Sequence, residues 1–116
     1  PLITFSNLEV LDAWVKKPEN RFNGKVRGVI LSEQGLNSPD YSEESLHNQA
    51  AGFAFFWSKV KNLDSIEGFH YHRWVDHGHE GGLLLGLWTL KPGTVIQADK
   101  KKPIWDVYRA ACNNSE

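Results

Sequence analysis

The chain has 116 residues, enough for one compact domain but fewer than the roughly 200 that a complete eight-stranded (β/α) barrel needs. Its formal net charge of −1, from 13 basic and 14 acidic residues, argues against nucleic acid or an anionic membrane as a partner. The single cysteine excludes an intrachain disulfide, and no apolar run approaches the roughly 20 residues of a membrane span.

The first residues predict the end of a strand followed by a helix. Leu2 to Phe5 is apolar enough to be the last part of a strand. Ser6, followed three residues later by Glu9, has the spacing of a capping box and predicts that a helix begins there. The apolar face of this helix would consist of Leu8, Leu11 and Val15.

The middle of the chain predicts a strand, a long helix and a second strand. Val26 to Ser32 contains a continuous apolar run without alternation, which is typical of a parallel strand buried on both faces. Ser42 can cap a helix whose apolar residues recur at steps of four and three. That stripe consists of Leu46, Ala50, Phe53, Trp57 and Val60. We expect the next strand from Ile66 to about His72.

The last third predicts an irregular connection and a final helix. Four glycines between residues 78 and 86 indicate a loop, to which Leu83 to Leu87 can add a short strand. KPGTVIQADKKK, at residues 91–102, reads as a solvated loop. Pro103 suits the first turn of a helix whose buried face would be Ile104, Val107, Tyr108 and Ala111. The order of elements favours an α/β fold with parallel strands, flanking helices and one unit over residues 1–116.

Glu33 is the strongest candidate for chemistry in the sequence. It directly follows the predicted strand at residues 26–32, and functional side chains gather at the carboxyl ends of strands in parallel β/α folds. A carboxylate that leaves a buried strand is held rigidly and partly desolvated, and Gly35 lets the backbone turn away. The alternative is a salt-bridged or solvated acid at a strand end.

A second group of polar residues follows the predicted strand at residues 66–72. His70 and His72 would lie on the same face of that strand, where both imidazoles can meet one ligand. Trp74 and Asp76 are further candidates for substrate contact, although Trp74 can equally pack under the glycine-rich loop. Asn37, with Asp40 and Tyr41, can line the rim beside Glu33 or simply form the entry to a helix.

Three segments together resemble a known fold family. VILSEQGLNS is similar to the seventh-strand segment of the clan of retaining glycoside hydrolase barrels, in which Ser or Thr, the nucleophilic Glu and a Gly follow an apolar strand. GLWTLKPGTVIQADKKKPIWDVYRAA resembles the way those barrels close. With SLHNQAAGFAFFW and HYHRWVDHGHEGGLLLGLW, the whole chain resembles an uncharacterised bacterial family assigned to that superfamily.

This resemblance implies a partial (β/α)8 barrel, or TIM barrel, running from the end of strand six through helix eight. Glu33 would be the nucleophile of a hydrolase that cleaves glycosidic bonds with two carboxylates, and a carbohydrate would be its partner. The acid/base residue would lie on strand four, outside this carboxy-terminal fragment, which alone would be inactive. His70, His72, Trp74, Asp76 and Asn37 would bind substrate, without a cofactor. A secreted or periplasmic location is also implied.

Two other functions remain open from the residues. The barrel can be a noncatalytic carbohydrate-binding or scaffold protein in which Glu33 only hydrogen-bonds a ligand. It can also be a metal-dependent enzyme, because His70 and His72 with Asp76 or His77 supply suitable zinc ligand types, although they match no known zinc spacing. A partial barrel leaves strand edges uncovered, so we expect it to assemble with the remainder of the barrel or to self-associate.

Overall fold

The computed structural model describes residues 2–113 and shows a mixed α/β fold. Its helices are α1 (Leu8–Lys16), the 3₁₀ turn η1 (Pro18–Asn20), α2 (Glu43–Val60) and α3 (Pro103–Asn113). Its strands are β1 (Val29–Gln34), β2 (Ile66–Tyr71), β3 (Trp88–Leu90) and β4 (Ala98–Lys101). The predicted α/β class is therefore confirmed, while no barrel is identified within residues 2–113.

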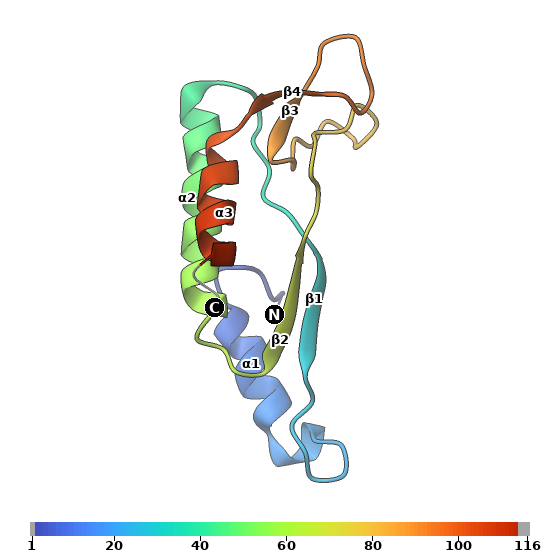
Figure 1. Cartoon of the computed structure of the whole chain (residues 1–116). Helices are drawn as coiled ribbons and strands as arrows, with labels where there is room; N and C mark the ends of the chain where they lie inside the picture. Colours follow the sequence, from blue (N-terminus) through green and yellow to red (C-terminus); the bar gives the residue numbers. More distant parts are fainter. Residues whose placement is uncertain (1, 114–116) are drawn as a thin grey trace.

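The strands form two separate sheets in an elongated molecule of 53 × 29 × 22 Å. β1 and β2 pair in parallel and are connected through α2, whereas β3 and β4 form an antiparallel hairpin at one end (Figure 1). α2 and α3 lie side by side along the β1–β2 sheet, and no element of residues 2–113 forms a layer on the opposite side of that sheet (Figure 1). None of the helices within residues 2–113 is both long and apolar enough to cross a membrane.

The core lies between α2 and the parallel sheet and is mainly aromatic. Phe53 and Phe56 of α2 are at most 1% exposed. The Phe56 ring lies 4.8 Å from that of Phe69 on β2, and Phe53 lies 5.8 Å from Tyr71 and 5.7 Å from Tyr108 of α3. These ring contacts fix both helices on one face of β2.

The predicted stripe on α2 is largely confirmed. Ala50, Phe53 and Val60 are buried, and Ser42 caps the helix, since its hydroxyl accepts the Ser45 N–H at 3.3 Å. The final helix also begins at Pro103 as predicted, with Ile104 and Ala111 buried.

The prediction that the first strand is buried on both faces is wrong. The strand spans Val29–Gln34 rather than residues 26–32, and within residues 2–113 it pairs with β2 only. Leu31 packs into the core, but Ile30 points to the opposite face beside Gly68 and is 61% exposed. The apolar run is thus covered on one face only.

The predicted strand end and capping box near the amino terminus are also wrong. Leu2 to Phe5 is not a strand, because a turn joins Thr4 to Asn7 through the Asn7 N–H and the Thr4 carbonyl at 3.1 Å. The α1 helix begins one residue after Asn7, while the Ser6 hydroxyl bonds to that of Thr4 at 2.7 Å. Glu9 instead contacts Lys59 at 3.2 Å, which ties α1 to α2.

Two predictions near the carboxyl end need correction. Residues 91–102 are not simply a solvated loop, since they contain β4, which pairs with β3. Lys102, at the end of the lysine run, is 1% exposed. The predicted strand at residues 83–87 is absent, and the strand in this region is β3, which begins at Trp88. In the hairpin, Trp88 pairs with Lys101 and Leu90 pairs with Ala98.

Candidate functional site

The carboxyl ends of β1 and β2 meet and place Glu33 beside His72. The His72 N–H donates to the Gln34 carbonyl at 2.7 Å, which joins the two strand ends. A side chain on Gly35 would place its Cβ 2.2 Å from the His72 carbonyl oxygen, so the close approach of the two backbones requires glycine there. Gly35 therefore acts through this close contact rather than through a left-handed turn.

Four charged or titratable side chains form a group at this end of the sheet, which we call the strand-end cluster: Glu33, His72, Arg73 and Glu80. His72 Nε2 lies 2.7 Å from Glu80 Oε1, and its Nδ1 lies 3.6 Å from Glu33 Oε1. Arg73 Nε lies 2.7 Å from the other oxygen of Glu80. His72 thus stands between two carboxylates from different parts of the chain.

The two carboxylates of the cluster have different surroundings. The Glu80 side chain is 17% exposed, and that of Glu33 is 71% exposed. Burial of Glu80 disfavours its charged form, but the hydrogen bond with His72 and the guanidinium of Arg73 together outweigh it and hold the pKa of Glu80 below its usual value. Glu80 is therefore a partly buried anion with partners, whereas Glu33 is open to solvent.

A tight turn directly follows Glu80. Gly81 and Gly82 have φ values of +63° and +83°, and the Leu83 N–H donates to the Glu80 carbonyl at 3.1 Å. These angles are those of a type I′ turn, which glycine adopts without steric cost. The turn reverses the chain after Glu80, which itself lies eight residues after His72.

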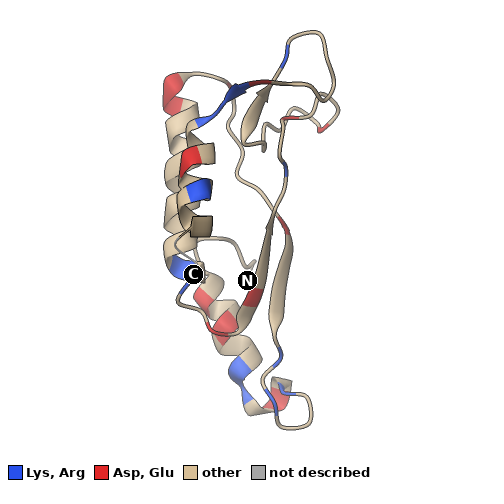
Figure 2. Ribbon diagram, in the orientation of Figure 1, with Lys and Arg blue, Asp and Glu red and all other residues tan. Residues whose placement is uncertain are grey.

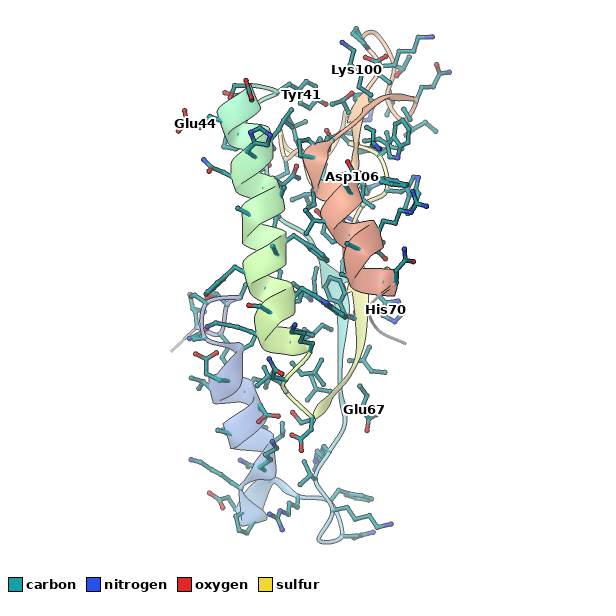
Figure 3. The ribbon with its side chains drawn as sticks, turned by 60° about the vertical axis from the view of Figure 1, so that its left-hand side comes forward. Tyr41, Glu44, Glu67, His70, Lys100 and Asp106 are labelled. Atoms are coloured by element: carbon teal, nitrogen blue, oxygen red, sulfur yellow. The ribbon has the colours of Figure 1, made fainter. Side chains whose placement is uncertain are left out.

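The structure brings Glu33 and His72 together but leaves His70 apart. His70 is exposed and projects from β2 on the side away from α2 (Figure 3). His72 lies just past the end of β2, where the backbone turns toward Glu33 and Glu80. That both imidazoles meet one ligand stays a prediction. The Glu33 side chain is also more exposed than a partly desolvated strand-end acid would be.

Asn37 and Trp74 border the loop that follows the cluster. The Asn37 side-chain oxygen accepts the Leu84 N–H at 2.8 Å, so Asn37 anchors that loop. Trp74 is 60% exposed, which leaves its indole face open rather than packed beneath the glycine-rich segment. A stacking role for Trp74 stays a prediction.

Asp76, predicted to contact substrate, is instead buried in a polar centre that sequence reasoning missed. It is 0% exposed, and its carboxylate lies 2.8 Å from the ammonium of Lys102, which is equally buried. The Tyr41 hydroxyl donates to Asp76 at 2.9 Å and the Gly86 N–H at 2.6 Å. These contacts occupy the carboxylate fully, so its role in this structure is structural.

The hydroxyl of Tyr41 reaches into this buried centre, although the residue as a whole is 42% exposed. Burial, together with its hydrogen bond to the Asp76 carboxylate, raises the pKa of Tyr41 to about 12, although the Leu90 N–H works in the opposite direction. Its hydroxyl therefore stays protonated and can donate to Asp76 while accepting from Leu90 at 3.0 Å. In Figure 3, Tyr41 lies where the amino end of α2 meets the segment before α3.

The histidine-rich segment does not assemble a metal ligand set in the described part of the chain. Within residues 2–113, no three His, Cys, Asp or Glu side chains are grouped so that they could hold a metal ion. The rings of His77 and His79 lie 5.9 Å apart, and the Asp76 carboxylate is taken by Lys102. The ligands proposed for zinc are therefore dispersed.

Acidic and basic positions are interspersed along the molecule, as Figure 2 shows.

Comparison with known proteins places the chain in one family. No curated protein and no solved structure matches the chain. The model of a family of unknown function, DUF5722, matches residues 1–116, which is the whole chain, and the protein therefore belongs to the DUF5722 family.

Proposed function

We propose that the protein is the carboxy-terminal part of a (β/α)-barrel glycoside hydrolase and that Glu33 is one of its two catalytic carboxylates. The observation that carries the proposal is the position of Glu33, an open carboxylate at the carboxyl end of a parallel strand, beside a histidine whose other nitrogen is fixed by Glu80. Catalytic groups occupy this place in β/α barrels.

The wider fold supports the barrel part of the proposal. β1, α2 and β2 form a parallel β-α-β unit whose helices cover one face of the sheet, the arrangement of two neighbouring units in a barrel wall. The other face carries the exposed Ile30 and His70. In a closed barrel, that face would point inward and would be covered by the remaining strands.

The proposed chemistry needs a second carboxyl group. In a retaining hydrolase, one carboxylate attacks the anomeric carbon while a carboxylic acid about 5 to 5.5 Å away protonates the leaving oxygen. Glu80 does not suit that second role, because His72 and Arg73 already bind both of its oxygens. We therefore assign the acid to a strand outside this chain and expect the chain alone to be inactive.

A carbohydrate-binding barrel without hydrolysis is the second candidate. The open indole of Trp74, 60% exposed, favours it, since an exposed aromatic face can stack on a sugar ring without any chemistry. In that case, Glu33 would hydrogen-bond a sugar hydroxyl.

Replacing Glu33 with Gln in the protein that carries the complete barrel tests the proposal. We expect kcat on a responsive glycan to fall by about 10³-fold or more, because the amide cannot attack the anomeric carbon. Hydrolysis is measured on a glycan panel by release of reducing ends. Glu67→Gln is the matched control, since Glu67 is an exposed acid near the start of β2 and its replacement should leave kcat unchanged (Figure 3).

The outcomes separate the candidates. Full activity of the Glu33→Gln variant would remove Glu33 from the mechanism. A wild-type protein that binds glycans, hydrolyses none and loses binding on Glu33→Gln would support the noncatalytic barrel instead.

A further inference from the structure

The proposed role of Glu33 does not explain why Glu80, the less exposed carboxylate of the strand-end cluster, contacts His72. We propose that Glu80 is a positioning residue that fixes the His72 ring with a proton on Nε2, so that Nδ1 is presented to Glu33. This inference rests on the proposed function of Glu33 for its catalytic meaning, but the ring geometry that it describes can be measured without activity.

The hydrogen bond between His72 and Glu80 has one possible direction. An ionised carboxylate has only acceptor oxygens, and Arg73, 2.7 Å from Oε2, favours the ionised form of Glu80. The Nε2 atom, 2.7 Å from Oε1, must therefore be the donor. This selects one tautomer of the neutral ring, with its proton on Nε2 and a lone pair on Nδ1.

The other ring nitrogen of His72, Nδ1, faces Glu33. Nδ1 lies 3.6 Å from Glu33 Oε1, so a lone pair on Nδ1 would face a carboxylate oxygen. The 3.6 Å separation is too long for a hydrogen bond, so Nδ1 is held as an acceptor beside the open Glu33 side chain. Of the described residues, the charged groups in contact with His72 are Glu33 from β1 and Glu80 from the loop, and Arg73 neutralises the far side of Glu80.

Other residues than Glu80 hold its loop in place. The main chain of Leu84 is bound by Asn37, by Ser38 and by the Gln49 amide at 3.0 Å. The Tyr71 hydroxyl donates to the Leu85 carbonyl at 2.7 Å. Because these contacts anchor the loop separately, losing the Glu80 carboxylate should change the ring of His72 without unfolding the segment.

Nitrogen NMR of ¹⁵N-histidine-labelled protein tests this assignment directly. The His72 ring signals are identified by their loss in a His72→Asn variant. For the wild type, we expect the neutral ring to be almost entirely the Nε2–H tautomer. Glu80→Ala should give a mixture of the two tautomers. In Glu80→Gln, Arg73 takes the single amide oxygen and the NH2 faces Nε2, so the ring should shift toward the Nδ1–H form.

Two results would overturn the inference. One is a neutral wild-type His72 with its proton on Nδ1, and the other is a tautomer ratio that Glu80→Ala leaves unchanged. The Glu67→Ala variant is the control and should give the wild-type ratio. If Glu80→Ala does not fold and Glu80→Gln folds poorly, Glu80 serves the fold. That result also contradicts the proposal.

Kinetics add a readout that links the positioning role to Glu33. In a protein that hydrolyses a glycan, Glu80→Ala should lower kcat by about 10-fold to 100-fold with little change in KM, and Glu80→Gln should not recover that loss. If the NMR result holds but no glycan is hydrolysed, the proposed function fails and the assignment of His72 stands. If glycans are hydrolysed but the His72 tautomer does not depend on Glu80, the proposed function stands and the positioning role is refuted.

Discussion

Replacement of Lys102 by Met should destabilise the protein by about 3 to 5 kcal/mol, because it leaves the Asp76 carboxylate buried without its counter-ion. Both side chains are 0% exposed, and Lys102 Nζ lies 2.8 Å from one Asp76 oxygen. Burial lowers the pKa of Lys102, while Asp76 opposes that shift and favours the ammonium. Tyr41 and Gly86 would be the remaining donors to the carboxylate, and both are neutral.

Equilibrium urea unfolding measures this effect, with Lys101→Met as the control. Lys101 is the preceding residue, but its side chain is 43% exposed and its pairing with Asp106 at 3.0 Å lies on the surface, so its loss should change stability little. Adding Asp76→Asn to Lys102→Met should recover part of the stability, since the unpaired charge is removed. Equal unfolding midpoints for the Lys101 and Lys102 variants would contradict this account.

Local patterns predicted the elements that frame the site. The long helix, the two strands on either side of it and the helix that begins at Pro103 were all predicted from periodicity, capping and the length of apolar runs. Two parallel strands joined by a helix end at the same edge of their sheet, which is why Glu33 and the residues after β2 could be expected to meet. His72 fulfils that expectation at 3.6 Å.

Long-range pairings were beyond the reach of those patterns. Asp76 and Lys102 are 26 residues apart, and Lys102 lies in a lysine run that resembles any solvated segment. Glu80 lies eight residues after His72 in an irregular segment, and no periodicity predicts that these two side chains meet. The burial of Ile30 was overestimated because an apolar run does not tell how many neighbours a strand has.

The predicted stripe on α2 did not include Phe56, although helical periodicity places Phe56 beside it. The predicted stripe passed from Phe53 to Trp57, but the structure buries Phe56 completely and leaves Phe55 53% exposed. Phe56 lies three residues from Phe53 and four from Val60 and so borders the stripe, whereas Phe55 lies on the opposite side of the helix. Contact with β2 buries Phe56, whose ring lies 4.8 Å from that of Phe69.

Replacement of Phe56 by Ala should therefore cost about 3 to 5 kcal/mol of unfolding free energy, the range for a fully buried aromatic side chain. Its ring lies 4.4 Å from that of Phe5 and 6.1 Å from that of Phe53, as well as against β2. Removing it leaves a cavity at the point where α2, the amino-terminal segment and the parallel sheet meet. The surrounding rings cannot collapse into this space without losing their contacts with one another.

Thermal and urea unfolding of Phe56→Ala and Phe55→Ala distinguish a specific core contact from a general loss of aromatic surface. Phe55 makes a surface contact with Lys59, whose ammonium lies 4.9 Å from the ring centre, so Phe55→Ala should shift the midpoint far less. A Phe55 effect as large as that of Phe56 would contradict the packing of α2 described above. Because Phe56 packs on β2, whose end carries His72, Phe56→Ala should also speed amide exchange along β2 and loosen the strand-end cluster.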